Sequence, residues 1–293
     1  MTKNLDNDYF DVKIPEITFS DLILSSRVLA DLSDSLQIIR NAKIIYDDWG
    51  LGRLTRGKKR FVLNLFGPPG TGKTECAEAI AKELDRSLLR LNYAAMESKY
   101  VGDTAKNIAR AFQFARENQL VMHWDEADTI LGRRLTNVTQ SADHAVNTSR
   151  TTMLLELESH TLPIIFSTNL VRNYDKAFER RIDFSIEFKL PDLEERKSLI
   201  RLVLTNELPK QPSLNIDSLA QSSEGLSPAD FKKAILIAVA RMFRPDRQVR
   251  ALGNEDMECA FAHIRAANTT SGSSDAASAT VDTAAEIFEA GKN

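Results

Sequence analysis

Apolar runs of five or six residues alternate with stretches of helical periodicity along the first 190 residues of the chain. The run at 61–66 is typical of a buried strand, those at 87–92, 120–124 and 162–167 predict three more strands, and residues 184–188 alternate between apolar and polar, as in a short fifth strand. Helices are predicted at 22–45 (one or two), 75–84, 105–117, 129–149 (mixed in character) and 150–158. Strands that alternate with helices favour an α/β fold, a three-layer parallel sheet covered by helices on both faces. Ligands of such sheets bind beyond the carboxyl ends of the strands.

The pattern changes at Pro191, after which no strand pattern returns. Helical spacing at 193–208, 227–243 and 254–267 predicts a small all-α domain. We therefore expect an N-terminal arm at 1–17, an α/β domain at 18–190, a helical domain at 191–268 and a tail at 269–293. The tail is rich in Ser, Ala, Thr and Gly, which predicts flexibility, and residues 281–290 fit either a terminal helix or a disordered end.

A glycine-rich loop stands between the first strand and the helix that follows it. The loop fits the phosphate-binding pattern G-x-x-x-x-G-K-[ST], and its residues are Gly67, Pro68, Pro69, Gly70, Thr71, Gly72, Lys73 and Thr74. Glycines let the backbone amides approach phosphate oxygens, and the helix N-terminus adds partial positive charge. Lys73 can reach the β- and γ-phosphates, and Thr74 offers its hydroxyl to Mg²⁺. A simple glycine-rich turn is the alternative, but the strand and helix around the loop favour binding of a nucleotide with Mg²⁺.

The third strand ends in an acidic pair, Asp125 and Glu126. Asp125 can hold Mg²⁺ through water, and Glu126 can polarise a water molecule toward the γ-phosphate. An acidic pair alone is more often the capped start of a helix, but a position after a strand and downstream of a phosphate loop favours the catalytic interpretation. His123 and Trp124, within the strand, are expected to be core residues whose polar atoms are satisfied.

Polar residues after the fourth strand complete the predicted site. Asn169 is expected to lie between Asp125 and the γ-phosphate and to orient the attacking water, although such a residue is commonly only a turn former. Arg180 and Arg181 precede the last strand and are expected at the rim of the α/β domain, too far to reach a phosphate bound by the same chain. An arginine supplied by a neighbouring subunit stabilises transition-state charge, whereas the alternative is a solvated surface pair.

The composition of the chain argues against a nucleic-acid-binding, a secreted or a membrane-spanning protein. Lys and Arg number 38 and Asp and Glu number 41 in 293 residues, so the near-balanced charge does not indicate a broad nucleic-acid-binding face. The two cysteines, Cys76 and Cys259, are far apart and are expected to be reduced, as in a cytoplasmic protein. The first ten residues are polar and acidic, unlike a signal peptide, and no apolar run is long enough for a membrane span.

Taken together, these motifs resemble those of AAA+ ATPases of the protein-remodelling type, over residues 18–267. In that resemblance Lys73 and Thr74 match the Walker A motif, and Asp125 and Glu126 match Walker B. Asn169 matches sensor 1, and Arg181 matches the arginine finger, with Arg180 as a second. The resemblance implies a P-loop NTPase domain, a helical lid over the nucleotide and a ring-shaped homohexamer with active sites between subunits. Many relatives carry an arginine where Ala229 stands, which puts a sensor 2 contact in doubt.

The segment Ser98–Asp103 resembles the loop that lines the central pore of AAA+ remodellers. Its central residues, Lys99, Tyr100, Val101 and Gly102, combine an aromatic ring that can grip a peptide with a glycine that lets the loop move. The alternative is a buried Tyr-Val pair at a helix start. The loop favours a polypeptide substrate that is remodelled or partly unfolded through the pore.

The substrate is left open by the sequence. Residues 223–227 and 175–178 resemble pachytene-checkpoint-type ATPases, which implies a HORMA-domain partner and, for a compact prokaryotic member, an antiviral (antiphage) signalling system. The pore loop is closer to microtubule-severing relatives, so disassembly of another protein complex is the alternative. Two further classes are a DNA-associated AAA+ loader, which DNA-stimulated turnover would favour, and a nucleotide switch with little turnover, which the presence of Glu126 disfavours.

Overall fold

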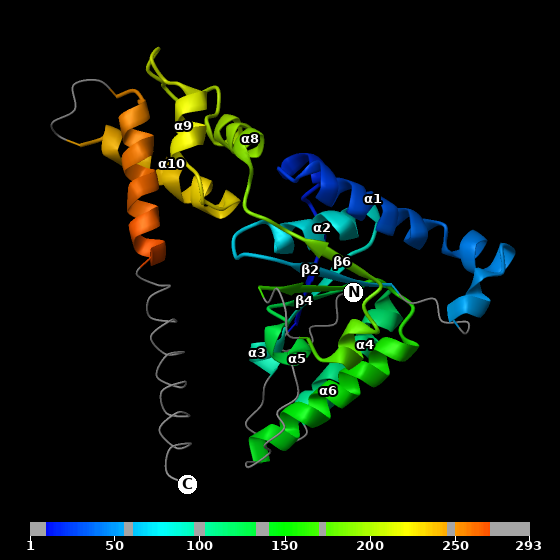
Figure 1. Ribbon diagram of the computed structural model, residues 1–293. Coiled ribbons are helices and arrows are strands. Elements are labelled where there is room, and N and C mark those ends of the chain that lie inside the picture. The colour runs from blue at the N-terminus through cyan, green and yellow to red at the C-terminus, as the bar shows by residue number, and fades with distance from the viewer. Residues whose placement is uncertain are drawn as a thin grey trace, which may run out of the picture. The chain divides into compact units, whose positions relative to one another are not determined.

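The computed structural model describes residues 10–55, 61–96, 103–132, 141–169, 174–244 and 250–269 of the chain (Figure 1). The chain divides into two compact units, residues 1–189 and 190–293. The boundary lies beside Pro191, where the sequence pattern changes. Within the described residues, no helix is long and apolar enough to cross a membrane.

The first unit is built on a six-stranded sheet with the order β1-β3-β4-β5-β2-β6. Its strands are β1 (Phe10–Lys13), β2 (Val62–Phe66), β3 (Leu88–Asn92), β4 (Val121–Asp125), β5 (Ile164–Thr168) and β6 (Phe184–Glu187). All neighbouring pairs are parallel except β1 and β3. The predicted α/β fold with a parallel sheet is therefore confirmed, and the five predicted strands lie within two residues of their expected positions at either end.

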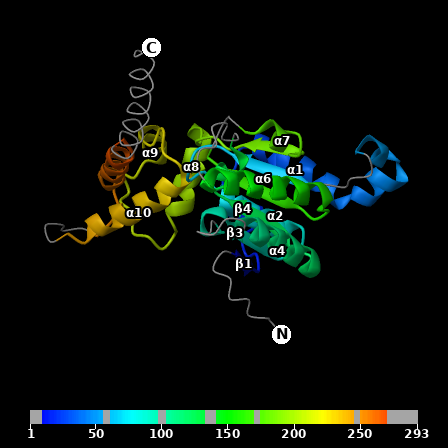
Figure 2. The same ribbon diagram turned by 90° about the horizontal axis from the view of Figure 1, so that it is seen from below.

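Helices cover both faces of the sheet (Figures 1 and 2). Side chains of α4 (Asp103–Asn118) and α6 (Ser141–Ser159) pack on one face around Trp124 of β4. Those of α1 (Ser26–Arg40) and α2 (Lys73–Glu83) pack on the other face, against Leu63 and Leu65 of β2. The smaller elements are η1 (Phe19–Asp21), η2 (Ile44–Asp48), η3 (Leu51–Thr55), α3 (Tyr93–Met96), α5 (Asp128–Leu131) and α7 (Lys176–Glu179). The mixed segment expected at 129–149 thus contains a short α5 and the start of α6, which continues without interruption through the separately predicted helix at 150–158.

Residues 10–13 differ from the expected loose arm, because they pair with β3 as an antiparallel edge strand. The strand is held by Glu78, a buried residue of α2. The Glu78 carboxylate accepts a hydrogen bond of 2.6 Å from Lys13 and further bonds from the backbone amides of Glu16 and Ile17. Burial opposes ionisation, but these donors hold the pKa of Glu78 below its ordinary value.

The second unit is helical throughout its named elements. It contains α8 (Leu193–Val203), α9 (Ile216–Ser222), α10 (Pro228–Met242) and a helix at 254–269. Phe231 and Phe261 form its core, with ring centroids 5.7 Å apart. The three helices expected here are present, α8 ending five residues earlier than predicted, and α9 was not predicted. These seven residues are too few for a clear period, and the Asn215 side chain, which accepts bonds from Asp217 and Ser218, caps the helix.

Candidate functional site

The glycine-rich loop joins β2 to α2 with a backbone that only glycine adopts easily. Gly67, Gly70 and Gly72 have φ angles of 143°, 74° and 92°, and Gly72 is the N-cap of α2. At Gly67 an added Cβ would overlap the carbonyl oxygen of Phe188. That carbonyl is fixed because the Phe188 amide bonds to Phe66 at the end of β2. The loop shape therefore depends on the neighbouring strand β6 as well as on its own sequence.

We expect Gly67→Ala to prevent formation of the native loop. The substitution adds both an unfavourable φ and a backbone overlap, and strain of this kind costs about 1–3 kcal/mol for the conformation alone. Nucleotide affinity, measured with a fluorescent ATP analogue, should fall at least tenfold, and the melting temperature should decrease. Gly50→Ala is a matched control, since Gly50 has a φ of 68° but nothing within 4 Å of the added Cβ. Equal loss of nucleotide binding in both variants would contradict the role of the Phe188 contact.

Lys73 is buried and lies against the loop that it follows. Its ammonium donates to the carbonyl oxygens of Gly67 and Pro68, both at 2.8 Å, and to Oδ1 of Asn169 at 2.9 Å. Burial lowers the pKa of Lys73, and the nearby carboxylates of Asp128 and Asp125 offset this only in part. A phosphate group beside Lys73 would supply the counter-charge that favours the ammonium form.

Asp125 is held from three sides at the end of β4. Thr74 Oγ1 lies 3.3 Å from both carboxylate oxygens. Ser167 donates to Oδ1 at 2.7 Å, and Arg90 donates to Oδ2 at 2.7 Å. Burial acts to raise the pKa of Asp125, but the hydrogen bonds from Ser167 and Arg90 and the charge of Arg90 hold the pKa below its ordinary value. The group is therefore a carboxylate at neutral pH.

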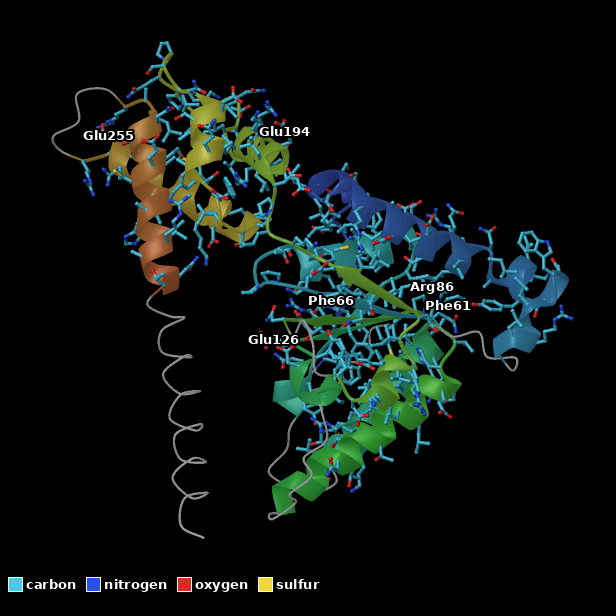
Figure 3. All side chains as sticks on the ribbon, in the orientation of Figure 1. Phe61, Phe66, Arg86, Glu126, Glu194 and Glu255 are labelled. Carbon is cyan, nitrogen blue, oxygen red and sulfur yellow. The ribbon has the colours of Figure 1, made fainter. Side chains whose placement is uncertain are left out.

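Glu126 follows Asp125 with a left-handed backbone, at a φ of 52°. A non-glycine residue in this region is uncommon and costs free energy, and such conformations concentrate at functional sites. The Glu126 amide donates to Oδ1 of Asp125 at 3.2 Å, and the residue is exposed. Figure 3 shows Glu126 at the same end of the sheet as Phe66, the last residue of β2, and away from Phe61.

Asn169 is fixed by Asp128, a residue that the sequence analysis did not single out. Asp128 Oδ1 accepts a bond of 3.1 Å from the Asn169 amide and a short bond from the Thr168 hydroxyl. With its backbone held by Asp128 and its Oδ1 bonded to Lys73, Asn169 lies beside the phosphate loop.

These residues surround one cavity of about 300 Å³. Its lining is mainly polar and consists of Pro69, Gly70, Gly72, Lys73, Thr74, Glu75, Arg90, Asp125, Glu126, Ser167, Thr168 and Asn169. The structure thus brings together the phosphate loop, the acidic pair and Asn169. In chemical terms it offers backbone amides and an ammonium group for phosphates, next to a carboxylate that can accept a proton.

The oxygen donors beside the loop suit Mg²⁺. The ion prefers a few hard oxygen ligands and retains several waters, so the Thr74 hydroxyl and the Asp125 carboxylate, together with phosphate oxygens, fit its requirements. The described residues contain no cluster of three or more His, Cys, Asp or Glu side chains suited to a metal. The residues present therefore fit a Mg²⁺ bound together with nucleotide, not an ion held by protein ligands alone.

The two arginines are not part of the cavity lining. Arg181 donates to the Ala177 carbonyl at 2.8 Å and makes a short ion pair with Glu158 of α6. Arg180 is exposed. The predicted pore-loop residues, Lys99 to Gly102, lie outside the described residues.

Three residues that contact the site were not predicted from the sequence. Arg90, Ser167 and Asp128 are ordinary strand or helix residues by pattern, and they reach the site only through the pairing of β3, β4 and β5. A signal existed for Asp128, because it stands three residues after Asp125 in a short acidic run. The expectation that His123 and Trp124 are satisfied core residues is half right: both are buried, but within the described structure Nδ1 of His123 and Nε1 of Trp124 have no hydrogen-bond partner.

Comparison with known proteins agrees with this geometry. Residues 63–190 match the family described as "ATPase family associated with various cellular activities (AAA)". Cell division protein C of Sulfolobus acidocaldarius is 31% identical over 262 residues, which are 83% of this chain and 66% of that protein. A probable 26S proteasome regulatory subunit 10B of Caenorhabditis elegans is 32% identical over 63% of this chain and 47% of that protein. A katanin p60 ATPase-containing protein of Rattus norvegicus is 27% identical over 78% of this chain and 50% of that protein.

A solved structure, the crystal structure of the FIGL-1 AAA domain, shares the fold. Its TM-score is 0.68 at 20% identity, with 88% of this chain and 86% of that chain covered. The chain spans about half to two thirds of the length of the curated relatives it matches. The matching family, these relatives and the nucleotide-site geometry agree that the chain carries a domain of the AAA family of ATPases, which covers residues 63–190.

Proposed function

We propose that this chain is the motor of a ring that uses ATP hydrolysis to remodel or disassemble a protein substrate. The observation that carries the chemistry is the convergence of Lys73, Thr74, Asp125, Glu126 and Asn169 on one cavity. The remodelling part is supported by the relatives, whose names describe a cell division protein, a regulatory component of the proteasome and a katanin protein.

The residues have separate tasks in the proposed hydrolysis. The loop amides and Lys73 bind the phosphates of ATP, and Lys73 exchanges its carbonyl partners for phosphate oxygens. Thr74 and Asp125 would hold Mg²⁺, which would neutralise charge on the phosphates. Asn169 orients a water molecule, and the Glu126 carboxylate takes its proton as the water oxygen attacks the γ-phosphorus and ADP leaves.

Assembly into a homohexameric ring is part of this proposal, and the position of the arginines supports it. Because Arg180 and Arg181 do not line the cavity of their own chain, their proposed role needs a neighbouring protomer. Each protomer would then hold nucleotide with one face and complete its neighbour's site with the other.

The proposed grip on the substrate is Tyr100, and a trapping experiment tests it. Glu126→Gln held in ATP should retain a bound client, which a pull-down and mass spectrometry identify. The variant that carries both Glu126→Gln and Tyr100→Ala should lose that client, because the aromatic ring is absent. Glu126→Gln with Tyr100→Phe keeps the ring and should retain it. The same clients on all three proteins would contradict the pore-loop mechanism.

A HORMA-domain partner is the finer prediction, and the relatives named above do not support it. Gel filtration of a closed HORMA–peptide complex, with the ATPase and ATP, tests it directly. Release of the peptide supports this substrate, and an intact complex leaves the disassembly of another protein complex as the function.

A further inference from the structure

A buried polar chain runs from the interior of the sheet to the proposed magnesium ligand, Asp125. We propose that His123 and Ser167 are positioning residues that fix the Asp125 carboxylate for Mg²⁺. This inference rests on the proposed role of Asp125 and adds two residues to it. Neither has a place in the predicted motifs.

Strand register explains how the three side chains meet. His123 and Asp125 are two residues apart on β4, so they point to the same face of the sheet. His123 pairs in register with Ile165 of β5, and Ser167 lies two residues beyond Ile165 on that same face. Ile165 packs in the cluster formed with α2, which is the helix that carries Thr74. These three side chains therefore lie on the face of the sheet that α2, the helix after the phosphate loop, covers.

The distances fix the direction of each hydrogen bond. Ser167 Oγ lies 2.7 Å from Asp125 Oδ1 and 2.9 Å from His123 Nε2. A carboxylate only accepts, so the single hydroxyl proton of Ser167 is donated to Asp125. Ser167 can then only accept from His123, which places the ring proton on Nε2. His123 Nδ1 is left as an acceptor with no partner among the described residues.

Burial makes this arrangement specific. His123 is fully buried and Ser167 is 2% exposed, so water does not compete for their bonds. An unbonded hydroxyl at this depth is unfavourable, which resists rotation of Ser167 away from Asp125.

The opposite oxygen of Asp125 has a different kind of partner. Arg90 contacts Oδ2 from the solvent side, and about half of its side chain is exposed. An exposed ion pair of this kind contributes little and exchanges easily with water or ions. Oδ1 is therefore firmly held by Ser167, which is bonded in turn to His123. Oδ2 faces the cavity, and its bond to Arg90 is easily exchanged.

The test measures how much Mg²⁺ strengthens binding of a non-hydrolysable ATP analogue, as the ratio of affinities in Mg²⁺ and in EDTA. Removal of a partner that orients a metal ligand typically costs about 10–100-fold in metal affinity, so His123→Leu and Ser167→Ala should each reduce the ratio about tenfold or more. Affinity in EDTA should stay within about twofold, because Lys73 and the loop amides are unchanged. His123→Gln retains an N–H donor and should recover most of the ratio.

His160→Leu is the matched control. His160 is also a buried histidine, packed edge-on against Phe112 with ring centroids 5.1 Å apart, and is not part of the cavity. His160→Leu should leave the ratio of affinities in Mg²⁺ and in EDTA unchanged. Melting curves of all variants check that they are folded. Because the two residues act in series, His123→Leu combined with Ser167→Ala should be no worse than Ser167→Ala alone.

Three outcomes overturn the inference: a normal ratio in His123→Leu, multiplied effects in the double variant, or a His123→Gln protein as impaired as His123→Leu. Asp125→Ala separates this inference from the proposed function. If Asp125→Ala does not lower the ratio, the proposed magnesium role of Asp125 itself fails. If it does so while His123→Leu and Ser167→Ala are normal, only the positioning role fails.

Discussion

Glu126→Gln should bind Mg-ATP with near-normal affinity but hydrolyse it about 10²–10⁴-fold more slowly, which is the expected cost of removing a positioned general base. The amide keeps the size of the side chain and cannot accept a proton. The left-handed backbone of Glu126 directs this residue away from the strand, beside a cavity that already holds Lys73 and Asn169. Steady-state release of phosphate measures turnover, and a fluorescent nucleotide measures binding.

Two comparisons make this result specific. Glu194→Gln makes the same chemical change at an exposed position of α8 and should hydrolyse ATP at the normal rate. Lys73→Ala should instead lose nucleotide binding, since it removes the ammonium that faces the phosphates. Turnover by Glu126→Gln at the normal rate would remove this carboxylate from the mechanism.

Arg181→Ala is expected to bind ATP and to hydrolyse it at least about 10³-fold more slowly, the scale on which arginine fingers act. Mixing Arg181→Ala with Lys73→Ala should restore part of the turnover. In the mixture, an intact nucleotide site of one variant meets an intact arginine of the other. Turnover per protomer of the unmodified protein should also rise with concentration as rings form.

Because Arg181 has contacts within its own chain, the experiment also needs a second arginine variant and a control for loss of charge. Its guanidinium is bound to Ala177 and Glu158 of the same chain, whereas Arg180 is exposed, so Arg180→Ala is measured beside it. Arg86→Ala is the control for loss of charge, since Arg86 bonds to Gln119 on the connection that follows α4. Turnover that is independent of concentration, with no recovery on mixing, would exclude the ring.

The fold could be predicted where local pattern decides structure. The four largely apolar runs became β2 to β5, the inner strands of the sheet, and the alternating run at 184–188 became the partly exposed edge strand β6. The edge strand β1 could not be predicted in this way. Its four residues are mostly exposed, and its place depends on Glu78, which is 65 residues away from Lys13.

The residues of the candidate site also form two groups, those that local spacing predicts and those that depend on the assembled sheet. Lys73, Thr74, Asp125, Glu126 and Asn169 were found because each follows a strand at a recognisable spacing, and parallel strands end at one edge. Arg90, Ser167 and Asp128 depend on which strands are neighbours. The order β3-β4-β5 is a property of the assembled sheet, and alternation of elements along the chain does not specify it.

The carboxylate of Glu78 also decides how the N-terminal strand unfolds. Glu78 lies on α2, the helix that starts at the phosphate loop, and bonds to Lys13, Glu16 and Ile17. If β1 peeled away, the Glu78 carboxylate would lose all three of these donors, one of them charged, and would exchange them for water. Fraying from this end is therefore opposed by contacts with the helix of the phosphate loop, and we expect amide exchange in residues 10–17 to slow when that helix is stabilised by nucleotide.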